Sequence, residues 1–125
     1  MKAMFVNENG CVPYARAIAN RIKPVETRNK NMLSALVGER VGIVRTGRGK
    51  SPAVVGFCTI YRATHETQKT MNSEYMRNLT LIPEGSRYDS GKNGKWCYWI
   101  TDAAPCDSFP LPADAIRHGR SWCEF

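Results

Sequence analysis

Three charged residues that follow a predicted helix are the part of this sequence best suited to do chemistry. Lys23, Glu26 and Arg28 have the spacing K-x-x-E-x-R. Pro24 disfavours the helical conformation at Lys23, so the helix is expected to end there and the chain to become extended. In an extended chain Glu26 and Arg28 point to the same face, where a carboxylate and a guanidinium pair well.

These three side chains predict a site for a polar ligand. Pairing with Arg28 keeps the Glu26 carboxylate ionised, and the flexible side chain of Lys23 reaches over the same face. Two cations and one anion around a concavity suit a small polar heterocycle or a ribonucleotide. The alternative is a solvated salt bridge on an exposed strand, which contributes little to stability.

Positive charge is concentrated in one segment of the chain. The net charge is +7; positions 16 to 50 hold nine basic and two acidic residues, while the other 90 residues hold nine of each. Such a field attracts polyanions, above all nucleic acid. Arg45, Arg48 and Lys50, at the end of this segment, are therefore predicted to contact phosphates. A mildly basic protein that is charged for solubility alone is the alternative.

The segment Gly47–Ser51 resembles a phosphate-binding loop but does not match one. The P-loop pattern requires a glycine where Val44 stands, and it requires a helix where Pro52 and a β-rich run follow. A hairpin turn is the simpler prediction. Its backbone amides remain able to contact phosphate.

Size and composition limit the class of protein. The 125 residues (14.0 kDa; 42% hydrophobic, 23% charged) fit one globular domain, 1–125. No apolar run approaches the roughly 18 residues of a membrane span, and the first ten residues lack the apolar stretch of a secretion signal. We therefore expect a cytoplasmic protein that does not contact membranes.

Cysteine and histidine spacing gives no indication of a metal or cofactor. The five cysteines are odd in number and form no C-x-x-C pair, and the two histidines lie far apart. Reduced thiols are the expected state. Cys58 and Cys97 lie in apolar runs and are predicted to be buried packing residues.

Hydrophobic periodicity and turn residues predict a mixed fold. Apolar positions recur at helical spacing in some segments and alternate in others, while proline and glycine mark the boundaries. The expected helices are 11–22, 32–37 and 70–81, and the expected strands are 25–28, 40–46, 53–63, 95–103 and 121–125. This pattern is typical of an α+β domain.

The strand at 95–103 carries three large aromatic residues. Trp96 and Tyr98 share one face, and Trp99 lies on the other. Packing in the core is the default for such residues, whereas an exposed ring would stack on a base. The sequence leaves open which face is inside.

Several motifs together resemble the ASCH domain family of the PUA-like group. Besides the K-x-x-E-x-R motif and the preceding Tyr-Ala pair, the resemblance covers Glu39–Val44, Val54–Ile60, Tyr98–Ala103, Pro110, Pro112, Gly119 and Trp122. It implies a PUA-like small β-barrel with flanking helices, present as a monomer or weak dimer. Arg21 replaces the glycine that the family has two residues before the lysine, and the interval between Ile60 and Lys92 resembles a local elaboration.

The resemblance also implies two functions. Members of the family are viewed as RNA-associated, which implies an RNA- or modified-nucleoside-binding module with a basic cleft around Lys23, Glu26 and Arg28. A subset is similar to small amidohydrolases that cleave N4-acetylcytidine with a lysine, a threonine three residues later and a downstream glutamate. The alternative is therefore a small hydrolase, an amidohydrolase or a ribonuclease, that uses Lys23 and a nearby carboxylate.

The hydrolase pattern is only partly present in this sequence. Lys23 occupies the family's lysine position, but Glu26 stands where the threonine is expected. Thr27 is one residue further on and is expected to face the other way. The downstream carboxylate is either Glu66 or Glu74, and Glu26 itself is a candidate base in an enzyme.

Overall fold

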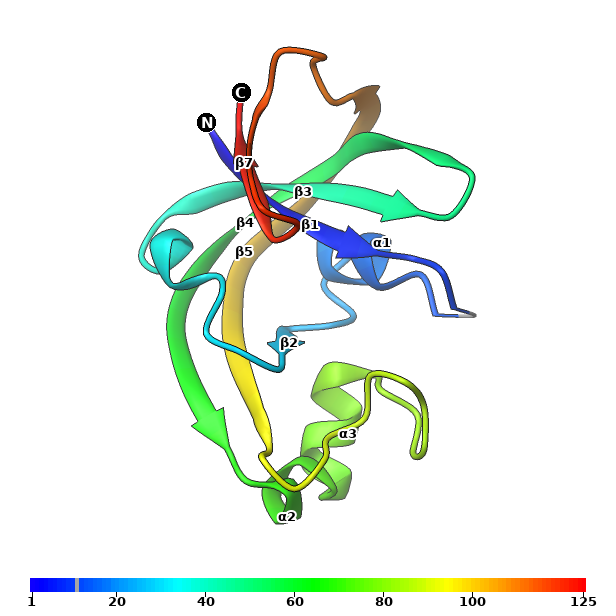
Figure 1. Ribbon diagram of the computed structural model, residues 1–125, viewed down its shortest axis with the longest axis vertical. Coiled ribbons are helices and arrows are strands. Elements are labelled where there is room, and N and C mark those ends of the chain that lie inside the picture. The colour runs from blue at the N-terminus through cyan, green and yellow to red at the C-terminus, as the bar shows by residue number, and fades with distance from the viewer. Residues whose placement is uncertain (11) are drawn as a thin grey trace.

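The computed structural model describes residues 1–10 and 12–125. Within them, seven strands form one mixed sheet in the order β2-β5-β4-β3-β1-β7-β6 (Figure 1). The strands are β1 Lys2–Asn7, β2 Val25–Arg28, β3 Arg40–Gly47, β4 Lys50–Glu66, β5 Lys95–Pro110, β6 Ile116–His118 and β7 Trp122–Glu124; the helices are α1 Tyr14–Ala19, α2 Gln68–Met71 and α3 Glu74–Thr80, with a 3-10 turn η1 at Ser34–Leu36.

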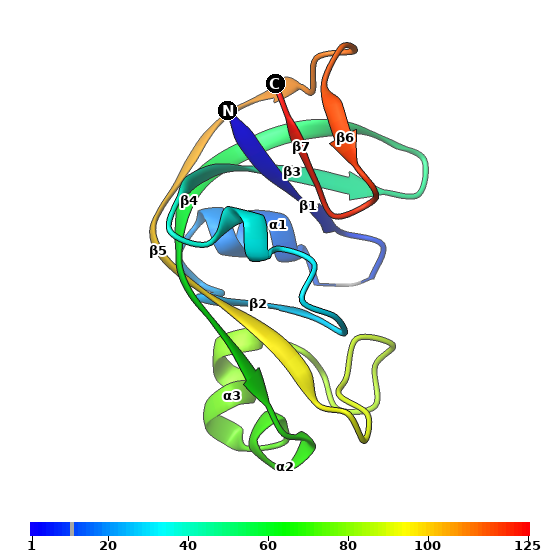
Figure 2. The ribbon, with the colours of Figure 1, turned by 60° about the vertical axis from the view of Figure 1, so that its left-hand side comes forward.

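The long antiparallel pair β4 and β5 gives the sheet its curvature. Their pairing runs from Ala53↔Pro110 to Glu66↔Lys95 and is interrupted by three register shifts. Irregularities of this kind bend a strand and increase its twist. The sheet therefore curls around α1, while the far ends of β4 and β5 lead to α2 and α3 (Figure 2).

The main core lies between α1 and the concave face of the sheet. Ala15 and Ile18 of the helix are fully buried against β-strand residues such as Val41 and Ile43. Gly56 permits the close approach, because a Cβ at this position would lie 2.7 Å from the Cβ of Ala19 and 2.6 Å from a backbone oxygen.

The α+β class is confirmed, but closure of the sheet into a barrel is not. In the described part of the chain β2 pairs only with β5, and β7 pairs with residues 2–4 of β1, on the edge that faces away from β3. Beyond β7, this edge of β1 meets β2 through a side chain: Nη2 of Arg28 donates to the carbonyl of Phe5 at 2.6 Å. Because β2 has only four residues and β7 occupies half of the β1 edge, a gap remains.

Several predicted elements have different boundaries. The helix expected at 11–22 spans only Tyr14–Ala19, and residue 11 lies outside the described residues. It ends because Arg21 takes a left-handed conformation (φ 64°) and the amides of Ile22 and Lys23 both bond to the carbonyl of Ala17. The helix expected at 32–37 is reduced to η1.

The helix expected at 70–81 is two short helices. Ser73 interrupts it, and its side chain accepts a hydrogen bond from the amide of Met76 at 3.2 Å, which caps α3. The sequence did not predict β1 and β6, and it ended β5 seven residues too early. No helix in the described residues has the length and apolar character to cross a membrane.

Both faces of the aromatic strand are packed. Tyr98 is fully buried in the main core, and Trp96 packs against the same cluster. Trp99, on the opposite face, packs against a second cluster that contains Val25 and Met76. The default prediction of core packing is therefore the correct one for this strand.

Candidate functional site

The gap between β1 and β2 opens into a cavity of about 390 Å³. Strands β1 and β2 supply its inner walls, and the hairpin of β6 and β7 borders its mouth. The lining residues are Phe5, Val6, Asn7, Tyr14, Lys23, Glu26, Thr27, Arg28, Thr46, Ile82, Tyr88, Arg117, Gly119 and Arg120.

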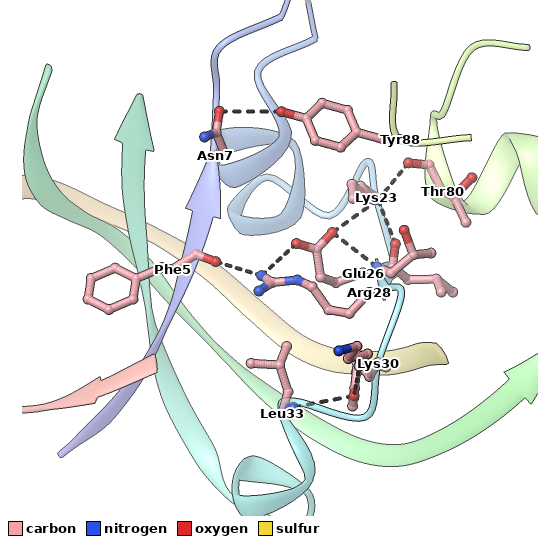
Figure 3. Close-up of polar contacts among 12 residues, drawn as sticks. Phe5, Asn7, Lys23, Glu26, Arg28, Lys30, Leu33, Thr80 and Tyr88 are labelled. Carbon is pink, nitrogen blue, oxygen red and sulfur yellow. Dashed lines mark hydrogen bonds and ion pairs between the residues drawn. The ribbon is translucent and has the colours of Figure 1, made fainter. Parts of the chain in front are cut away.

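Lys23 is buried at the wall of this cavity and has three acceptors around its ammonium group (Figure 3). Its Nζ donates to the carbonyls of Val25 at 2.7 Å and Thr80 at 2.6 Å. The third neighbour is Oε1 of Glu26 at 3.5 Å. Three acceptors match the three protons of an ammonium ion, so this geometry fits a charged lysine.

Glu26 joins Lys23 to Arg28. Its Oε2 accepts a hydrogen bond from Nη2 of Arg28 at 3.0 Å, and its Oε1 accepts one from the amide of Thr27 at 3.2 Å. The side chain of Glu26 is only 10% exposed and that of Lys23 only 1%. A buried carboxylate thus holds two cations in place through charge-assisted bonds.

Burial and charge act on these groups in different directions. Burial lowers the pKa of Lys23 below its ordinary value, and the negative charge of Glu26 opposes that shift. Burial by itself raises the pKa of Glu26, but the adjacent charges of Lys23 and Arg28 outweigh it, so the net pKa is lowered. Glu26 therefore remains an anion under neutral conditions.

Aromatic rings form another wall of the cavity. Tyr14 of α1 and Tyr88 of the connection between α3 and β5 meet edge to face, with ring centroids 5.7 Å apart. The Nζ of Lys23 lies 5.1 Å from the centre of the Tyr14 ring, and the hydroxyl of Tyr88 lies 3.5 Å from Oδ1 of Asn7. The site thus combines buried charge with aromatic surface.

The predicted ligand residues fall into two groups. Lys23, Glu26 and Arg28 lie together in the cavity, as their spacing suggested. Arg45, Arg48 and Lys50 do not line it. Arg48 and Lys50 are exposed at the turn between β3 and β4, and Arg45 donates to the carbonyl of Ser51 in the same hairpin at 3.1 Å.

The two downstream carboxylates considered for a hydrolase do not line the cavity, whereas Glu26 does. Glu66 is at the end of β4, and Glu74 is exposed at the first turn of α3. Thr27 does line it, although alternation along β2 places its side chain on the opposite face from Glu26. The reason is that β2 is an edge strand, and its unpaired edge is open to the cavity.

Sequence reasoning did not identify Arg117, Arg120, Tyr14 and Tyr88 as ligand residues. The two arginines come from a segment that is neutral overall, and the tyrosines from elements far apart in the sequence. The sequence signals that could have found them are Gly119, which is typical of a turn between the two arginines, and the Tyr-Ala pair that contains Tyr14.

The structure accounts for Arg21 at the position where the ASCH family pattern has a glycine. A glycine takes positive φ without strain, and Arg21 adopts φ 64° at this position. Its Nε donates to the carbonyl of Ala103 at 2.7 Å, which ties the end of α1 to β5. Arg21 thus takes, just before Lys23, a conformation that a glycine would take without strain.

None of the cysteines in the described residues lines the cavity. Cys58 and Cys97 are buried, as predicted, and burial raises the pKa of Cys58 to about 12 and that of Cys97 to about 11. Cys11 lies outside the described residues. Within the described part of the chain, no three or more His, Cys, Asp or Glu side chains are grouped to hold a metal ion.

The sequence and the structure were compared with those of known proteins. No protein-family model and no curated protein matches the sequence. Three crystal structures of ASCH from Zymomonas mobilis resemble the fold: the protein itself (24% identity, 87% of this chain and 73% of that chain, TM-score 0.68), a serine-to-alanine mutant (24%, 87% and 74%, 0.68) and a tyrosine-to-phenylalanine mutant (26%, 89% and 77%, 0.66). The chain has an ASCH-like fold, as its motifs implied.

Proposed function

We propose that this chain is a binding module for RNA or a modified nucleoside, and that the cavity between β1 and β2 is its binding site. The observation that carries the proposal is the buried Lys23–Glu26–Arg28 network beside the aromatic wall of the cavity. The ASCH-like fold supports it, since that resemblance implies a PUA-like RNA-binding module.

The cavity has the size and chemistry for a nucleoside. About 390 Å³ lies within the range of small-ligand pockets, roughly 300–1,000 Å³. A base has both a polar edge and an aromatic face, and the cavity offers Glu26 and Arg28 to the first and Tyr88 to the second. In the described structure both hydrogen bonds of Arg28 come from Nη2, so its Nη1 is left for a ligand.

A longer RNA would leave the cavity along the hairpin of β3 and β4. Thr46 of β3 lines the cavity, and Arg48 and Lys50 follow it at the exposed turn. The backbone amide of Arg48 donates to Oδ1 of Asn9, which anchors the turn beside β1. We propose that Arg45, Arg48 and Lys50 contact phosphates outside the cavity.

Salt dependence of RNA binding tests this proposal. For a single-stranded RNA oligomer, log Kd should rise linearly with log salt concentration, because phosphate contacts release counterions. Changing Arg45, Arg48 and Lys50 together to Gln should reduce that slope by about two, at roughly 0.7 per contact. A triple variant of Arg62, Lys69 and Lys92, which are exposed elsewhere, controls for net charge.

Two results would contradict the binding proposal. One is an affinity for RNA that does not change between low and moderate salt. The other is an equal effect of the two triple variants, which would mean that net charge alone attracts the RNA.

Hydrolysis is the second candidate, and one observation favours it: Lys23 lines a cavity next to a carboxylate, and its pKa is lowered by burial. The substrate would be an acylated nucleoside such as N4-acetylcytidine, or the phosphodiester of RNA. Because Lys23 donates to two carbonyls and pairs with Glu26, it would have to lose a proton and at least one of these contacts to act as a base.

Screening acylated nucleosides and short RNAs for turnover separates the two functions. Wild type, Lys23→Met and Glu39→Gln are compared. Glu39 is exposed just before β3 and does not line the cavity. Turnover that is lost in Lys23→Met, with the variant still folded by circular dichroism, supports the hydrolase. RNA affinity without turnover supports the binding module.

A further inference from the structure

Two arginines stand at the mouth of the cavity with their positive charges uncompensated. Arg117 of β6 and Arg120 of the turn that follows both line the cavity and are both exposed. Within residues 1–10 and 12–125 neither guanidinium has an ion-pair or hydrogen-bond partner. The Cζ atom of Arg117 lies 5.1 Å from the centre of the Phe5 ring, and a guanidinium stacked on an aromatic ring keeps its donors available.

The other cations of the cavity are already engaged. Lys23 donates to two carbonyls and pairs with Glu26, and Arg28 bonds to Glu26 and to the carbonyl of Phe5. These two charges stabilise the buried carboxylate, so they offer little net attraction to an anion. The anion-binding capacity of the cavity is therefore at its mouth.

The hairpin that carries the two arginines is held in shape. Gly119 takes φ 62°, which permits the three-residue turn between His118 and Trp122. The rings of His118 and Trp122 stack at 3.9 Å on the hairpin, and Lys2 of β1 lies 5.6 Å from the Trp122 ring. A braced turn presents arginines with less loss of conformational entropy on binding.

We infer that the ligand of this cavity carries a phosphate, which Arg117 and Arg120 bind while the base enters toward Glu26 and Tyr88. The chemical class is thus a nucleotide, or one nucleotide unit of an RNA, in preference to a free nucleoside. This inference rests on the proposed function and adds to it the group that determines affinity. Guanidinium groups favour phosphate because their planar donors match its oxygens.

Calorimetric titration with matched ligands tests the inference. The four nucleosides are compared with their 5′- and 3′-monophosphates at about 0.1 M salt, where the Debye length is about 10 Å. For at least one base, we expect a monophosphate to bind wild type at least tenfold more tightly than the nucleoside. The double variant Arg117→Gln/Arg120→Gln should lose tenfold or more of the nucleotide affinity and change the nucleoside affinity less than about twofold.

A second double variant, Arg62→Gln/Lys69→Gln, removes the same number of charges from β4 and α2, outside the cavity. At this salt concentration, charges more than about 10 Å away are largely screened, so the variant should leave nucleotide affinity within about twofold of wild type.

The outcomes separate this inference from the function on which it rests. Nucleosides that bind as tightly as their monophosphates overturn the phosphate inference and leave the nucleoside site standing. An equal loss in the two double variants also overturns it, since it shows a general charge effect. Absence of binding to every nucleoside, nucleotide and RNA oligomer overturns both.

Discussion

Replacing Glu26 by Gln should destabilise the fold far more than removal of a surface charge. Glutamine has the same size as glutamate but no charge, so the buried ammonium of Lys23 and the largely buried guanidinium of Arg28 lose their counter-ion. The side chain of Glu26 is 10% exposed, that of Lys23 1% and that of Arg28 15%. Removing one partner of a buried ion pair costs about 3–5 kcal/mol, because the remaining charge is left uncompensated.

The size of this effect is measurable by urea or thermal unfolding. A loss of about 3–5 kcal/mol is a large part of the 5–15 kcal/mol that stabilises a typical domain. At about 4 °C per kcal/mol for a domain of this size, the melting temperature should fall by roughly 12–20 °C.

Glu39→Gln is the matched control for this substitution. Glu39 pairs with Lys2 at 2.8 Å, but its side chain is 45% exposed, so its removal should cost less than about 1 kcal/mol. If Glu26→Gln and Glu39→Gln destabilise the protein equally, the Glu26 carboxylate does not compensate buried charge and the reasoning is wrong.

The difference between wild type and Glu26→Gln should also depend on pH. The pKa of Glu26 is lower in the folded protein than its ordinary value of 4.5. Its contribution is therefore fully present above pH 4.5 and is lost as the pH falls through the folded pKa. Unfolding curves of the two proteins should converge below pH 4.5, and a difference that stays constant down to complete protonation would contradict this assignment.

Two further pairs of substitutions test the backbone. Arg21→Gly removes the cost of a positive φ but loses the hydrogen bond to Ala103, so its free energy of unfolding should stay within about 1 kcal/mol of wild type. Arg21→Val, which places a β-branched residue at the same positive φ, should lose about 2 kcal/mol of stability. Gly94→Ala should prevent stable folding, because the added Cβ would lie 2.0 Å from the carbonyl oxygen of Glu66. Gly85 also has a positive φ of 76°, but no atom lies within 4 Å of an added Cβ, so Gly85→Ala should cost only about 1 kcal/mol. Denaturant unfolding measures both effects, and equal losses in the two glycine variants would show that the close contact is not the cause.

Local signals in the sequence predicted the central elements and the buried charges. Pro24 separates the α1 helix from β2, and alternation places Glu26 and Arg28 on one face, where they form an ion pair. These features depend on neighbours within a few residues, where backbone sterics and side-chain direction are decisive. The same reasoning placed Cys97 in the interior, because it lies in an apolar run.

Elements that depend on distant partners have weaker local signals. β1 was missed because its pairing with β3 joins residues about 39 positions apart, as in Ala3↔Gly42. β6 is three exposed residues that become a strand only through β7. The predicted helix at 70–81 was divided because Ser73 makes a better cap than a helix interior.

The sequence by itself predicted that Lys23, Glu26 and Arg28 lie close together, because Glu26 and Arg28 alternate onto one face of an extended segment and Lys23 stands just before it. Only the tertiary structure decided that this network is buried, since the curled sheet places β2 opposite β1 and Arg28 spans the gap to Phe5. It also brought Arg117 and Arg120 to the mouth of the same cavity, about 90 residues along the chain from Lys23. The cluster of positive charge in the sequence predicted a polyanion partner. Long-range strand pairing decides which of the cations face the cavity, and the residues that determine this pairing are distributed over the whole chain.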